Sequence, residues 1–255
     1  EINLAMSGYA PQQSIEVLKR YGIERNPKIV LFQIFYGNDM GDAFRFAQWQ
    51  ASGKSYFQFT RDEFGAMPQL FLTWKYIEGL LRLNRPHPDT NQEEKWKPIE
   101  CNLNGEIVPM GFYPNPHMWV LNKDELFNHP GFYYLMTSIK EAKQICDSIG
   151  AEFIVCLIPD KLMVYYDFIA DEENLGRLLE QQNHEKLKIE RGKQELREKL
   201  DGQKDLFNQA LTNYQIQFID FTEPLREHVK NSGDVLYYRY DTHWNAKGHE
   251  QAAQI

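Results

Sequence analysis

The sequence is short of cysteine, of excess positive charge and of long apolar runs. Its three cysteines, Cys101, Cys146 and Cys156, have no metal-binding spacing, and the apolar patterns around the last two predict buried, reduced thiols without a disulfide framework. A formal net charge of -8 argues against a nucleic-acid partner, because binding to a phosphate backbone relies on clustered lysine and arginine. No uninterrupted apolar run approaches the roughly 20 residues that span a bilayer, so no transmembrane segment is predicted.

The composition and the order of apolar segments predict a single globular α/β domain over residues 1–255. With 42% hydrophobic and 25% charged residues, the chain can bury a substantial core. The predicted strands are 29–36, 153–158 and 217–221. The predicted helices between them include 11–21, closed by Gly22, and 132–149, closed by Gly150. Strand 29–36 is apolar on both faces, which is typical of parallel strands covered by helices.

A charged segment, residues 171–214, is dense in Glu, Lys, Gln and Arg, with apolar residues at helical spacing. This pattern predicts long helices with a solvated face rather than a binding patch. Asp201-Gly202 predicts an interruption between them.

The stretch Tyr240-Asp241-Thr242-His243-Trp244-Asn245 places a carboxylate two residues before an imidazole, just ahead of a predicted helix. Loops at element ends are where a general base and the group that orients it are often found. Asp241 and His243 therefore resemble the second half of a nucleophile-His-Asp relay, in which the carboxylate fixes the imidazole tautomer. An ordinary helix-capping loop is the alternative for this hexapeptide taken alone.

Three short blocks carry a family resemblance. A turn at Gly8 follows a predicted strand, Gly37-Asn38-Asp39 follows the next strand, and Asp241 and His243 stand near the C-terminus. Together they resemble the second, third and fifth blocks of the SGNH (GDSL-type) hydrolases. The resemblance implies a three-layer α/β/α sandwich of the flavodoxin-like type around a parallel sheet. It also implies that Gly8 N–H and the Asn38 side chain help form an oxyanion hole, and that Asp241 orients His243.

The match departs from the family pattern in three places. The last block is Asp-x-His rather than the commoner Asp-x-x-His, with Tyr240 where that aspartate would fall. In the third block Gly37 directly precedes Asn38. The first block, Gly-Asp-Ser with the nucleophile, is absent. We therefore expect a fragment whose nucleophilic serine lies upstream of Glu1 and which is inactive alone. Ser7 is a less favoured substitute, because a serine beside the block-two glycine is usually a turn residue.

Residues 43–130 form a long insertion after the Gly-Asn-Asp strand. It is rich in aromatic residues, and we name Phe44, Trp49, Tyr56 and Phe57 as candidate substrate-binding side chains. An insertion leaving the C-terminal end of such a strand can fold over the site as a lid or substrate wall. The alternative is that these rings form a small core of their own.

A second resemblance lies at Pro159-Asp160-Lys161, which follows a predicted buried strand. The tripeptide is similar to the equivalent loop of SGNH-like polysaccharide O-acetyltransferases of the alginate type. A charged turn after a strand explains the same residues equally well.

The function that the resemblance implies is serine-dependent hydrolysis of acyl or acetyl esters through an acyl-enzyme, which requires neither a metal nor an organic cofactor. The substrate would be a small-molecule or carbohydrate ester. Acyl transfer to a polysaccharide hydroxyl is the first alternative, and a non-catalytic carbohydrate- or ester-binding module is the second. Family resemblance also allows a cell-envelope or secreted location, which the sequence itself does not decide.

Overall fold

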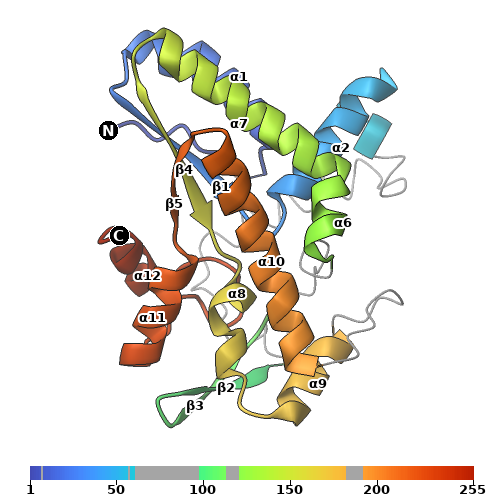
Figure 1. The fold of residues 1–255 in the computed structure, drawn as a ribbon, viewed down its shortest axis with the longest axis vertical. Helices are drawn as coiled ribbons and strands as arrows, with labels where there is room; N and C mark the ends of the chain where they lie inside the picture. The colour runs from blue at the N-terminus through green and yellow to red at the C-terminus, as the bar shows by residue number, and fades with distance from the viewer. Residues whose placement is uncertain (7, 57, 61–97, 113–120, 182–191) are drawn as a thin grey trace, which may run out of the picture.

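The computed structural model describes residues 1–6, 8–56, 58–60, 98–112, 121–181 and 192–255. Within these ranges the chain forms two sheets. The larger sheet is parallel, with strand order β1-β4-β5 (Figure 1), and consists of β1 (Ile29–Phe35), β4 (Glu152–Ile158) and β5 (Gln217–Asp220). The smaller is an antiparallel hairpin of β2 (Ile99–Leu103) and β3 (Glu106–Met110), which turns through two residues with positive φ, Asn104 and Gly105.

Helices flank the larger sheet, which confirms the predicted α/β class. The helical segments are α1 (Pro11–Val17), the π-helical turn η1 (Leu18–Gly22), the 3-10 turn η2 (Ile23–Arg25), α2 (Asp39–Ser52), α6 (Lys123–Asn128), α7 (Pro130–Ser148), α8 (Lys161–Tyr165), the 3-10 turn η3 (Tyr166–Phe168), α9 (Glu172–Gln181), α10 (Gly192–Asn213), α11 (Thr222–Ser232) and α12 (Ala246–Ala252). Of these, α7 packs on β4 and α10 on β5. The hairpin lies beside α9, beyond the end of the sheet (Figure 1).

At β1, the core lies on one face of the larger sheet. Phe32 and Ile34 of β1 are buried, and the Phe32 ring packs 5.8 Å from that of Phe153 in β4. On the opposite face, Ile29 and Leu31 are 54% and 59% exposed. The prediction that both faces of this strand are covered is therefore wrong at β1. Successive side chains of a strand point to opposite faces, and only the Phe32 face of β1 meets the core.

The N-terminal segment differs from the prediction in two ways. Residues 1–6 form no strand, and the side chains of Ile2 and Met6 remain more than half exposed because they reach no core. The first helical run also continues past Gly22 and ends at Asn26, which adopts φ 47°. Gly22 allows close packing inside this helical run, because a Cβ at this position would lie only 2.8 Å from Cδ1 of Leu18.

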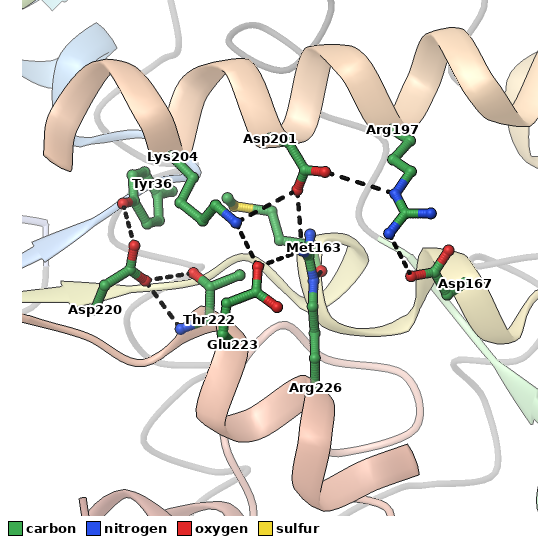
Figure 2. A network of polar contacts seen from close by, with 10 residues as sticks. All are labelled: Tyr36, Met163, Asp167, Arg197, Asp201, Lys204, Asp220, Thr222, Glu223 and Arg226. Carbon is green, nitrogen blue, oxygen red and sulfur yellow. Dashed lines mark hydrogen bonds and ion pairs between the residues drawn. The ribbon is translucent and has the colours of Figure 1, made fainter. Parts of the chain in front are cut away.

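The long helix α10 passes without a break through Asp201 and Gly202, so the predicted interruption is wrong. Asp201 accepts a hydrogen bond from Arg226 Nη1 at 2.9 Å and pairs with Lys204 at 3.8 Å, as Figure 2 shows. Gly202 faces the backbone of Lys123, whose nitrogen would lie 3.8 Å from an added Cβ. Tertiary contacts on both residues therefore outweigh their weak helix propensity.

A polar network joins α10, α11 and α8 (Figure 2). Arg226 of α11 donates through Nε to the carbonyl of Met163 at 2.6 Å and through Nη1 to Glu223 at 2.9 Å. Its guanidinium carbon lies 4.7 Å from the centre of the Tyr166 ring. Because Arg226 is only 8% exposed, these contacts fix the segment that follows β4 firmly against α11.

The predictions on cysteine are confirmed. Cys101, Cys146 and Cys156 are buried and free, and burial raises the pKa of each thiol, that of Cys101 to about 12. Across the described part of the chain, every helix is too short or too polar to cross a membrane.

Candidate active site

Three loops leave the larger sheet at the same edge. The parallel register pairs Phe35 with Ile158, and Leu157 with Asp220, so β1, β4 and β5 all end there. The backbone N–H of Tyr36 extends the ladder by donating to Ile158 O at 3.0 Å. The carboxyl ends of parallel strands are the usual position for ligand sites in α/β folds.

Asp241 and His243 form a hydrogen-bonded pair. Oδ1 of Asp241 accepts from the backbone N–H of His243 at 2.8 Å and also contacts Nδ1 of the same imidazole. Burial raises the pKa of Asp241, but the hydrogen bonds from His243 outweigh that effect and the pKa is lowered overall. An ionised carboxylate can only accept, so it favours the tautomer with the proton on Nδ1. The side chain of His243 is 80% exposed, and its Nε2 is left as a base.

Asn38 begins α2 at the carboxyl end of β1. Its Nδ2 donates to Oδ2 of Asp42 at 2.8 Å, and Asp42 also pairs with Arg45 at 3.4 Å. A side-chain amide carries two N–H donors, and the bond to Asp42 uses one of them.

Asp39 follows Asn38 and is held against the end of the strand. Its Oδ2 accepts from the backbone N–H of Phe35 at 2.9 Å. Burial raises the pKa of Asp39 to about 7, although this hydrogen bond acts in the opposite direction. Between about pH 4 and pH 7 the folded protein therefore keeps a proton that the unfolded chain has lost.

The Asp39→Asn variant is expected to be more stable than the wild type at pH 8, by at most about 4 kcal/mol. Folding becomes less favourable as pH rises through this window, because the carboxyl group must ionise in a buried position. Asparagine cannot ionise and can still accept from Phe35. Urea unfolding from pH 4 to pH 8 measures how the free energy of unfolding of each variant changes with pH. As the control, Asp171→Asn should bring no such gain, because hydrogen bonds from Asn174 lower the pKa of Asp171. A wild-type unfolding free energy that does not change across the window would contradict the prediction.

The predicted turn at Gly8 is present. Gly8 is exposed and has φ 79°, a conformation that favours glycine. Ser7 lies outside the described residues. The convergence of Gly8, Asn38 and His243 on one oxyanion stays a prediction.

The candidate substrate-binding rings lie along α2 and just beyond it. Trp49 contacts Phe46 and Tyr56 edge-on, with ring centres 5.1 and 5.3 Å apart, and Phe44 packs against His129 at 5.5 Å. Tyr56 is 61% exposed. Phe57 and much of the predicted insertion lie outside the described residues, so the lid remains a prediction.

Lys161 belongs to the Pro159-Asp160-Lys161 tripeptide that the sequence singles out, but its support of the Asp241–His243 loop was not predicted. Lys161 is 1% exposed and donates to the carbonyls of Tyr238 and Arg239 at 2.8 and 2.7 Å. Asn245 caps α12 by accepting from Gly248 N at 3.0 Å. The available signal was the Pro-Asp-Lys tripeptide directly after the buried strand β4.

The fold is of the α/β class, and Asp241 and His243 form a hydrogen-bonded pair on the loop before α12, beside the segment that follows β4. Residues 181–255 match the family described as SGNH hydrolase-like domain, acetyltransferase AlgX. This segment contains both residues of the pair. The resemblance to SGNH-type hydrolases, with similarity to O-acetyltransferases, is therefore confirmed. No curated protein and no solved structure matches the chain.

Proposed function

We propose that the full-length protein is a serine-dependent enzyme that hydrolyses carboxylic esters through an acyl-enzyme. The observation that carries this proposal is the contact between Asp241 Oδ1 and His243 Nδ1, which leaves Nε2 of an exposed imidazole as a general base. The nucleophile is the serine of a Gly-Asp-Ser block, which the family resemblance implies and which residues 1–255 do not contain.

The proposed reaction has two balanced halves. The serine Oγ attacks the ester carbonyl while His243 Nε2 takes the hydroxyl proton, and Asp241 stabilises the imidazolium. The bond to the alcohol then breaks, and the imidazolium returns the proton to the leaving oxygen. In the second half, water attacks the acyl-enzyme carbonyl while His243 Nε2 takes a proton from the water. The bond to the serine Oγ then breaks, the acid leaves, and the imidazolium returns the proton to Oγ. The N–H of Gly8 and the second N–H of Asn38 would stabilise each oxyanion, a role for which one donor is worth about 3–4 kcal/mol.

Acyl transfer to a sugar hydroxyl is the second candidate, favoured by the match to an acetyltransferase family. The first half-reaction is the same, and an acceptor hydroxyl replaces water in the second. The outcome depends on whether the site holds an acceptor and excludes water. The ring cluster of Phe46, Trp49 and Tyr56 offers aromatic surface on which a carbohydrate chain can stack.

The test is to incubate full-length protein with p-nitrophenyl acetate, with and without acetyl-free oligosaccharides. Release of p-nitrophenol measures the first half-reaction, and mass spectrometry of the oligosaccharide detects transferred acetyl groups. Release without sugar acetylation supports hydrolysis, and acetylated sugar supports transfer. No release above the background rate, together with no labelling by a fluorophosphonate, would overturn both and favour a binding module.

A further inference from the structure

Lys161 is a buried lysine, and among the residues that the structure describes the hydrogen-bond partners of its amine are backbone carbonyls rather than carboxylates. It is 1% exposed, and its Nζ donates to the backbone carbonyls of Gly111, Tyr238 and Arg239 at 2.9, 2.8 and 2.7 Å. An ammonium group has three N–H donors, so this set uses all of them. The carbonyl of Asp241 lies at 3.5 Å as a fourth neighbour. Burying a charged amine costs free energy unless it is well hydrogen-bonded, and here backbone carbonyls of the catalytic loop supply most of the bonds.

The loop is also held at two further points by the segment after β4. Tyr237 donates through its hydroxyl to Pro159 O at 2.9 Å, and the hydroxyl of Tyr165 accepts from Leu236 N at 2.8 Å. Lys161 lies between Pro159 and Tyr165 in the chain and binds the stretch that leads into Asp241. The segment of residues 159–165 therefore binds the loop at several successive residues, and Lys161 makes the middle contacts.

The carbonyls bound by Lys161 connect directly to the catalytic pair. Tyr238 accepts from Lys161 through its carbonyl and donates its N–H to His243 O at 3.1 Å. Arg239 O also accepts from Gly111 N at 2.8 Å, which ties the loop to the end of the hairpin. Burial lowers the pKa of Lys161 to about 7. A neutral amine has only two N–H donors and would leave one of the three carbonyls without its bond.

We propose that Lys161 is a positioning residue that holds the Asp241–His243 loop in its active geometry by binding the carbonyls of Tyr238 and Arg239. This role rests on the proposed function, and it assigns to the Pro-Asp-Lys tripeptide a task in the reaction. Lys161 touches neither the reacting atoms nor the imidazole. It acts through the backbone that carries them.

The test compares Lys161→Met with Lys193→Met in the full-length enzyme. Methionine has a similar length and no donor. The control removes a lysine that also binds backbone carbonyls, those of Asp167 and Ile169 at 3.0 and 3.5 Å, neither of which belongs to the Asp241–His243 loop. We expect Lys161→Met to lower kcat about 10- to 100-fold, as misplacement of a catalytic group by about 1 Å can. KM should stay within about twofold, since the loss falls on transition-state stabilisation, and Lys193→Met should leave both constants near wild type.

A second readout, NMR of histidine-labelled protein, needs no substrate. The His243 signal, identified among the seven histidines by its loss in His243→Gln, should show a weakened or exchange-broadened Nδ1 proton in Lys161→Met but not in Lys193→Met. If Lys161→Met does not fold, Lys161→Arg keeps the charge and should give a smaller kcat loss in the same direction. Folded variants with unchanged kcat and an unchanged His243 signal would overturn the proposal. An inactive wild type with a normal His243 signal would contradict the proposed function alone.

Discussion

His243→Ala is expected to lower kcat of the full-length enzyme by on the order of 10⁶-fold, and Asp241→Asn by on the order of 10⁴-fold. The alanine variant lacks the proposed general base. In Asp241→Asn, the Oδ1 atom can still accept from the His243 backbone, but the carboxylate that favours the Nδ1–H tautomer and stabilises the imidazolium is lost. Because the side chain of His243 is 80% exposed, its removal should change the free energy of unfolding by no more than about 0.5 kcal/mol.

The matched control is a second histidine-aspartate pair in the same part of the molecule. Nε2 of His228 lies 3.0 Å from Oδ2 of Asp234, which also pairs with Lys247 of α12. Asp234 links His228 of α11 to Lys247 of α12, and the hydrogen bonds from Lys247 and His228 lower the pKa of Asp234. His228→Ala should therefore leave kcat within about threefold of wild type, as expected for a residue outside the chemistry. Near-normal turnover of Asp241→Asn would mean that another group serves His243.

The elements that the sequence predicts well are those with a strong local pattern. The apolar run 153–158 became β4, and the helical pattern before Gly150 became α7, because periodicity and a glycine stop act within one segment. The Asp241–His243 contact was predictable for the same reason, since the two residues are only two positions apart and a short loop brings their side chains together.

The features that the sequence does not reveal depend on contacts between distant segments. The amine of Lys161 donates to the backbone carbonyls of Tyr238 and Arg239. Every residue has a backbone carbonyl, so the sequence does not show which carbonyls a lysine will bind. The exposed face of β1 also depends on contacts between distant segments. Leu31 is as apolar as a core residue, and only the packing of helices decides which face of the strand is buried. Gly202 of α10 likewise lies against Lys123, a residue from another helix, which the local sequence around Gly202 does not reveal.

Gly131→Ala is expected to destabilise the protein by about 2–3 kcal/mol, within the range for an overpacked core. Gly131 stands in the first turn of α7, where a Cβ would lie 2.2 Å from the backbone oxygen of Met40 in α2. Backbone at that distance cannot move aside as a flexible side chain can, so the two helices must separate. Met40 follows Asn38 by two residues, and the same shift should move the proposed oxyanion donor and lower kcat.

Gly41→Ala, in the facing helix, is the control for this prediction. A Cβ at Gly41 meets nothing within 4 Å, so alanine should raise stability by about 0.5–1 kcal/mol through its better helix propensity. Urea unfolding of both variants measures the difference, and kcat of the full-length protein reports the position of Asn38. Equal stability of the two variants would show that α2 and α7 tolerate a wider separation than their contact at Met40 indicates. A stability loss in Gly131→Ala with unchanged kcat would instead show that the position of Asn38 does not depend on this helix contact.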